Sequence, residues 1–231
     1  MATERTELTG APLHGFQGDR GEIPLAEGPL GLSVAITREA GSRGGSVARL
    51  LGRRLGWQVY DQELLEYMAS SDTARDDILR DLPPDASAWA EHRLELMQNE
   101  GRISHMDELR GLPRLMLMLA ARGRVIIVGR GAGYLLPGES TLHARMIAPI
   151  PARVGYLSLH LRLTAAGAEE QMRQRDNSRN AYLSRHFHID ATENCGYDMI
   201  LNSLPLGEET CAQLLATAAR SREARWGERA G

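Results

Sequence analysis

Short apolar runs alternate with stretches whose apolar residues recur every three or four positions. The short runs are typical of strands buried on both faces, and the longer stretches are typical of amphipathic helices. We expect strands at 30–37, 57–60, 125–128, 143–148 and 197–201, with helices at 46–55, 62–70, 151–162, 165–185 and 208–225. This order predicts an α/β fold, a doubly wound parallel sheet of about five strands with flanking helices.

Two segments depart from the alternation. Residues 1–29 mix Gly, Pro, Glu and Thr without a strand or helix period, so we expect a disordered N-terminal tail outside the fold. Residues 30–231 should form one α/β domain. Within it, residues 72–122 are charged and helical in pattern, with breaks at Pro83–Pro84 and Gly111–Pro113. We interpret that stretch as a helical insertion.

The composition restricts the partners. A net charge of −3 gives no support to a general nucleic-acid-binding surface, so we expect small-molecule ligands and no nucleic acid. The longest apolar run, 115–121, is far shorter than the ~20 residues that cross a membrane. No signal-peptide pattern begins the chain, and Cys195 and Cys211 fit two free thiols in a reducing compartment. We therefore expect a cytoplasmic protein without a membrane partner.

Glycines gather after the first predicted strand, in Arg38-Glu-Ala-Gly-Ser-Arg-Gly-Gly-Ser46. Such a loop can turn its N–H groups toward an anion, and the following helix, which Ser46 could cap, adds about half a positive charge. A phosphate ligand would be bound by Gly41, Ser42, Arg43, Gly44, Gly45 and Ser46. The chain has no lysine, however, and Gly44 stands where a phosphate-binding loop has one. Taken alone, a tight strand-to-helix turn explains the loop about equally well.

Other polar residues follow the same edge of the predicted sheet. Arg130, between two glycines after the strand at 125–128, could hold a phosphate or simply pair with a carboxylate. Asp61 follows the strand at 57–60 and could orient an acceptor, although capping the next helix is the more common role. No cluster of Cys or His has the spacing of a metal site.

Arg175 and Arg179 share one face of a predicted helix and could clamp a triphosphate. The alternative is a solvated helix face, on which Asp176 pairs with Arg173 and Arg179 three residues away. Composition alone favours this alternative.

Several segments, in the right order, resemble the cytidylate-kinase-like proteins of the nucleoside monophosphate kinase group. Residues 36–48 are similar to the family's I-S-R-x-x-G-S-G-G-R-x-I-A, and 55–65 to L-G-x-x-x-Y-D-x-E-L-I. Residues 128–133 resemble its G-R-x-x-x segment, 148–153 its A-x-x-x-x-R, and 175–179 its lid motif R-D-x-x-x-R. The resemblance implies the fold of the phosphate-binding-loop kinases, with a lid at about 164–190.

The resemblance also implies a phosphotransferase that uses ATP and a pyrimidine nucleoside monophosphate, with CMP as the favoured acceptor. Mg²⁺ is expected, with no protein ligand assigned. Catalytic roles fall to Arg43, Arg175 and Arg179, and substrate-binding roles to Arg38, Asp61, Arg130 and Arg153. Arg43, or Arg38 from the loop entrance, would replace the missing lysine.

Three departures from the family pattern favour an alternative function. Gly131 stands where true cytidylate kinases have the Asp of G-R-D, Gly45 stands where they have Ser or Thr, and Arg43 stands where the lysine-free relatives have Gly. A nucleotide-binding or regulatory module without turnover would fit these losses. A purely structural scaffold would leave the two glycine loops unexplained.

Overall fold

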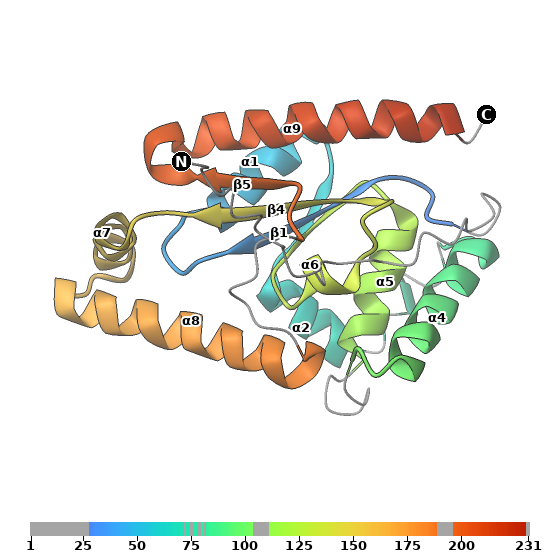
Figure 1. Cartoon of the computed structure of the whole chain (residues 1–231), viewed down its shortest axis with the longest axis horizontal. Coiled ribbons are helices and arrows are strands. Elements are labelled where there is room, and N and C mark those ends of the chain that lie inside the picture. Colours follow the sequence, from blue (N-terminus) through green and yellow to red (C-terminus); the bar gives the residue numbers. More distant parts are fainter. Residues whose placement is uncertain are drawn as a thin grey trace, which may run out of the picture.

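A parallel sheet of five strands forms the centre of the molecule (Figure 1). The computed structural model describes residues 28–71, 73, 76–77, 80, 82–103, 111–188 and 196–229. The strands are β1 (Ser33–Arg38), β2 (Gln58–Tyr60), β3 (Val125–Val128), β4 (Thr141–Ile147) and β5 (Met199–Asn202). Their spatial order is β2-β3-β1-β4-β5, and every pair is parallel. The predicted α/β class is confirmed.

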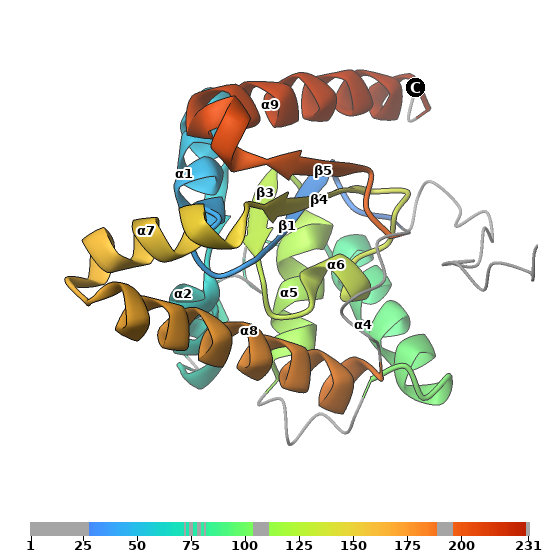
Figure 2. The same ribbon diagram turned by 60° about the vertical axis from the view of Figure 1, so that its left-hand side comes forward.

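Helices cover both faces of this sheet (Figures 1 and 2). In the described part of the chain they are α1 (Gly44–Leu55), α2 (Gln62–Ser70), α4 (Pro84–Asn99), α5 (Leu112–Arg122), α6 (Ala132–Leu135), α7 (Ile150–Leu161), α8 (Ala165–Phe187) and α9 (Ser203–Arg229). α1 and α9 pack on one face, where Val47, Leu51 and Leu215 join the strand residues Ile36 and Ile126 in one apolar cluster. α2, α4, α5 and α6 join a second cluster on the other face.

The middle of the sheet is apolar on both faces because β3 lies between β2 and β1. All four residues of β3 are buried, with Ile126 facing the α1 cluster and Ile127 facing the α5 cluster. α5 is also buried along most of its length, which explains its nearly continuous run of Leu, Met and Ala. An apolar run without a polar face is typical of an element enclosed by others.

The strand register places the candidate residues together. β1 pairs with both β3 and β4, and Ile36 lies opposite Val128 and Ala144. The carboxyl ends of parallel strands lie at one edge of the sheet, so Arg38, Asp61 and Gly129 all follow a strand at that edge.

The first helix begins earlier than the sequence predicts. α1 starts at Gly44, and its N-cap is Arg43 in a left-handed conformation with φ 59°. Ser46 is therefore no cap, and its hydroxyl accepts a hydrogen bond from Arg49 Nη2 at 3.3 Å. The apolar pattern begins only at Val47, so it could not show that two glycines form the first turn. The predicted end of the helix at residue 55 is confirmed, and Gly56 follows as its C-cap with φ 70°.

Other predicted boundaries are close to the observed ones. α9 starts at Ser203 instead of 208, with a kink at Gly207, where φ is 74° and ψ is 163°. Cys211 is a buried free thiol, whereas Cys195 and residues 1–27 of the predicted tail lie outside the described residues. The stretch 72–122 contributes α4 and α5 to one core cluster with the sheet, and its origin as an insertion stays a prediction. None of the helices described is long and apolar enough to cross a membrane.

Candidate functional site

A cavity of about 830 Å³ opens at the carboxyl edge of the sheet. Its walls come from the ends of β1, β2 and β3, the first turn of α1, and one face each of α7 and α8. Figure 2 shows α7 and α8 side by side on this side of the sheet. Among the described residues that line the cavity, arginines outnumber carboxylates: Arg38, Arg43, Arg49, Arg130, Arg175 and Arg179 against Glu39, Asp61 and Glu63.

The loop between β1 and α1 is held in a tight turn. The backbone N–H and the hydroxyl of Ser42 both donate to the Glu39 carbonyl, at 3.2 and 2.8 Å. Gly41 has φ +81°, and a Cβ there would lie 2.7 Å from the Arg153 carbonyl oxygen. Another residue would be strained at this position, so Gly41 is required by the close approach of α7.

The first turn of α1 presents unpaired backbone donors to the cavity. α1 has no side-chain cap and no acidic residue in its first turn. The first N–H groups of a helix have no acceptor within it, and Gly44, Gly45 and Ser46 line the cavity. Backbone donors of this kind, with the positive end of the helix dipole, favour an anion.

Arg38 extends from the end of β1 into the cavity. Within the described chain it makes no hydrogen bond and no ion pair, and its Nη1 lies over Gly129 so closely that a Cβ there would overlap it. The pKa of Arg38 is lowered to about 10, mainly by burial and then by the nearby Arg179 and Arg130, while Asp61 opposes the shift. The guanidinium remains charged at neutral pH, so an anion in the cavity would stabilise it.

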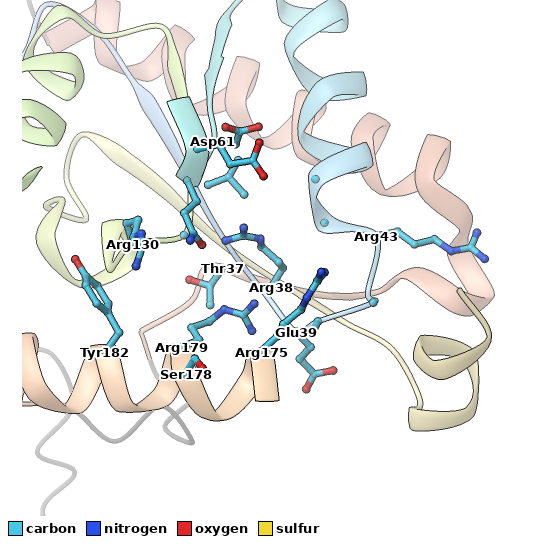
Figure 3. Close-up of a pocket in the computed structure, with 18 of the residues that line it drawn as sticks. Thr37, Arg38, Glu39, Arg43, Asp61, Arg130, Arg175, Ser178, Arg179 and Tyr182 are labelled. Carbon is cyan, nitrogen blue, oxygen red and sulfur yellow. The ribbon is translucent and has the colours of Figure 1, made fainter. Parts of the chain in front are cut away.

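Two arginines reach the cavity from α8 (Figure 3). Arg179 Nη1 lies 2.7 Å from Asp176 Oδ1, whereas Arg175 is exposed and has no ion-pair partner in the described part of the chain. Of the two ion pairs that the solvated-face alternative predicts, Asp176 with Arg173 and Asp176 with Arg179, only the second is present among the residues described. Arg173 instead lies 3.7 Å from Glu169 and from Glu170, because those carboxylates are one helical turn away.

Arg43 and Arg153 are turned away from the centre of the site. Figure 3 shows Arg43 pointing away from the other labelled arginines; its Nη1 lies 3.5 Å from Glu208 Oε1, and its guanidinium lies over the Tyr156 ring at 5.1 Å. Its charge is already paired with Glu208, so we do not retain its catalytic role, although it lines the cavity at its edge.

Arg153 is buried and does not line the cavity. Its Nε donates to the Ala40 carbonyl at 2.7 Å, its Nη2 pairs with Asp176, and its Nη1 lies 3.4 Å from Glu39 Oε2. Asp176 in turn accepts from the Ala40 N–H at 2.8 Å. Arg153 thus ties the loop to α8, and we do not retain it as a substrate ligand.

Arg130 and Asp61 line the cavity on the other side of Arg38 from Arg43 (Figure 3). Arg130 forms an ion pair with Glu66 on α2, and its guanidinium lies over the Tyr182 ring at 4.9 Å. Burial lowers the pKa of Arg130, with Tyr182 opposing. The carboxylate-pair alternative is therefore realised, although Arg130 also lines the cavity. Asp61 Oδ1 accepts from the Leu64 N–H at 3.1 Å, so the capping alternative is confirmed as well.

Sequence reasoning missed Ser178 and Tyr182, which line the cavity from α8. Together with Arg175 and Arg179 they recur at helical spacing on one face of α8. The helical period counted from Arg175 could have found them.

The first backbone N–H groups of α1 and the guanidinium groups of Arg38 and Arg175 line the same cavity, an arrangement that favours an anion. Metal ligands are sparser. Among the described residues, no group of three or more His, Cys, Asp or Glu side chains could hold a metal ion.

Of three similar solved structures, the first supports the same fold. An uncharacterized protein from Eubacterium ventriosum has 19% identity and a TM-score of 0.58, over 82% of this chain and 98% of its own. Shikimate kinase from Acinetobacter baumannii, solved with shikimate, has 11% identity and a TM-score of 0.44, over 84% of this chain and 96% of its own. A sugar kinase from Janibacter sp. has 15% identity and a TM-score of 0.40, over 81% of this chain and 93% of its own. No curated protein sequence matches the chain.

The sequence model of the cytidylate kinase-like family matches residues 33–204, a range that runs from the first residue of β1 to the start of α9 and contains both glycine loops and the arginines of α8. The chain therefore belongs to the cytidylate kinase-like family.

Proposed function

We propose that this protein transfers the γ-phosphoryl group of ATP to a nucleoside monophosphate, with CMP and UMP as the first acceptors to test. One observation carries the proposal. Arg38 and Arg175 line the cavity without a carboxylate partner in the described chain, beside the uncapped N-terminus of α1. A site with surplus positive charge and free backbone donors is suited to a polyphosphate.

The two ends of the cavity suit two different ligands. The loop and α1 would bind the donor phosphates through backbone N–H groups, while Arg175 and Arg179 would neutralise charge on the group in transfer. Asp61, Arg130 and Tyr182 would hold the acceptor at the other end. Arg130 would exchange part of its pairing with Glu66 for the acceptor phosphate.

Mg²⁺ would neutralise charge on the phosphate oxygens when bound with ATP. Gly45 offers no hydroxyl where related phosphate-binding loops have Ser or Thr, and the carboxylates that line the cavity form no metal-binding group. We therefore assign the ion mainly to phosphate and water ligands, as is common for Mg²⁺.

Base discrimination should be weak. Gly131 has φ +79°, and a Cβ there would overlap the Phe187 ring at the end of α8. The Asp by which true cytidylate kinases contact the cytosine nucleotide has no room at this position, so another group would have to read the base. We expect the rates with CMP and UMP to differ less than tenfold, the order of a single modest contact.

The absence of lysine favours a second candidate, a nucleotide-binding module without turnover. Loss of a transition-state contact to a phosphoryl group can lower a rate by several powers of ten. The two candidates bind the same ligand and differ only in chemistry.

The test combines ATP, Mg²⁺ and each nucleoside monophosphate with the purified protein and measures ADP formation. Arg175→Ala should lower kcat by about 10–1000-fold. Arg173→Ala is the matched control on the same helix, because Arg173 pairs with Glu169 and Glu170 and lies outside the cavity lining. Thermal stabilisation by ATP without ADP formation would instead support the binding module.

A further inference from the structure

One side chain fills the space where a loop lysine would begin. A Cβ built on Gly44 would lie 2.6 Å from Arg38 Cβ and 3.1 Å from Arg38 Cγ, with Met146 Cβ at 3.4 Å. Gly44 is the position at which the phosphate-binding-loop pattern has its lysine. Its backbone φ is not in the left-handed region, so only the neighbouring side chain obstructs a lysine there. Because the closest of these atoms is the Cβ of Arg38, any residue other than glycine at position 38 would meet a side chain at position 44.

A second glycine lets the same side chain continue. Arg38 leaves the end of β1, passes Gly44 and ends over Gly129, where a Cβ would overlap Nη1. Figure 3 shows its guanidinium between Asp61 and Arg179, near the middle of the labelled side chains. Gly44 and Gly129 come from the two separate glycine loops. Both loops thus make room for one arginine.

The charge of Arg38 lacks a fixed counter-ion. It has no ion pair within the described chain, and Arg179 and Arg130 disfavour its charge while Asp61 favours it. The other candidate for the lysine's role, Arg43, pairs with Glu208 and points outward. A guanidinium also offers a planar pair of donors that matches two phosphate oxygens.

We propose that Arg38 replaces the missing loop lysine, reaching the donor phosphates from the end of β1 through the space that Gly44 leaves free. The proposal rests on the proposed phosphate-binding function. It adds that the cation comes from the preceding strand and not from the first turn of the helix, where a side chain at position 44 would meet Arg38.

The test uses Arg38→Ala, Gly44→Lys and the double variant Arg38→Gly/Gly44→Lys. Gly44→Lys alone should lower the melting temperature because the new side chain meets Arg38. Glycine at position 38 in the same molecule should restore much of this loss, because it also removes the Cβ that would lie 2.6 Å away. ATP affinity, measured by titration calorimetry, should fall about 10–100-fold in Arg38→Ala, the size expected for charge-assisted hydrogen bonds. The double variant should regain most of this affinity through the lysine.

Two further variants separate charge from packing. Arg38→Met keeps an apolar stem beside Gly44 and removes only the guanidinium, so it should lose ATP affinity like Arg38→Ala while remaining folded. Arg173→Ala should bind ATP like the wild type.

The outcomes also separate this proposal from the proposed function. If the wild type binds ATP and both Arg38 variants bind equally well, Arg38 has no such role although the site stands. A folded double variant that regains no affinity overturns the replacement of one cation by the other. If the wild type binds no ATP at all, the proposed function itself fails.

Discussion

Replacing Arg153 with methionine tests how the phosphate-binding loop is held in place. Arg153 is buried, and its guanidinium joins the Ala40 carbonyl, Glu39 and Asp176. Methionine keeps an apolar stem of similar length but leaves that carbonyl and both carboxylates without this donor. We expect a less stable protein whose loop is no longer tied to α8.

The structure sets the size of the effect. Removing one member of a fully buried ion pair costs about 3–5 kcal/mol. Here the side chains of Glu39 and Asp176 are 27% and 24% exposed, and Asp176 keeps Arg179 as a partner, so both can be partly compensated. We therefore expect a loss of about 2–3 kcal/mol, or a melting temperature lower by about 4–12 °C for a chain of this size.

Urea unfolding followed by tryptophan fluorescence measures this loss, since Trp57 and Trp89 are buried in the two core clusters. Arg173→Met is the matched control. Its side chain is 60% exposed and its ion pairs are 3.7 Å long, so its removal should cost less than about 1 kcal/mol. Equal unfolding free energies for the two variants would refute the structural role of Arg153.

Three more predictions concern single positions. Gly131→Ala should lower the free energy of unfolding by more than about 2 kcal/mol, because its φ is +79° and a Cβ there would meet the Phe187 ring. Gly138→Ala is the control and should be nearly neutral, because a Cβ at Gly138 would lie in open space. Equal melting temperatures for the two variants would contradict this prediction. Asp61→Ala should cost about 1 kcal/mol of stability and Asp61→Asn much less, since Asn also caps a helix; equal unfolding midpoints would refute the cap. Burial lowers the pKa of His143 in the folded protein below its usual 6.5. The unfolded chain therefore binds a proton at this histidine at a higher pH than the folded chain does. The free energy of unfolding should fall as the pH drops below about 6.5. His143→Gln should flatten that slope between about pH 7 and pH 5, and an unchanged slope in urea titrations would argue against the shift.

The sequence was sufficient to predict the sheet and the sheet edge at which the cavity opens. The runs 33–38 and 125–128 are short, apolar and followed by glycines, so both strands and their shared edge follow from local pattern. Arg175 and Arg179 could be placed on one helical face for the same reason. These inferences need only the spacing of apolar residues along the sequence and the parallel arrangement of the strands.

The roles of single arginines depended on contacts that no local pattern contains. Arg43 points away from the other arginines and pairs with Glu208 on α9. Arg153 is buried against Ala40, Glu39 and Asp176, which come from distant parts of the chain. The need for glycine at position 44 could not be predicted from the sequence either. It depends on the close approach of Arg38 on the preceding strand, a contact that only the three-dimensional structure shows.

The most direct test of the proposed function follows the γ-phosphoryl group of ATP in a single turnover. With excess protein, γ-labelled ATP, Mg²⁺ and CMP or UMP, we expect labelled CDP or UDP from the wild type and from Arg173→Ala, with at least tenfold slower formation by Arg175→Ala. No labelled diphosphate from any nucleoside monophosphate would contradict the transfer, and the absence of any ATP-induced rise in melting temperature would contradict the nucleotide site itself.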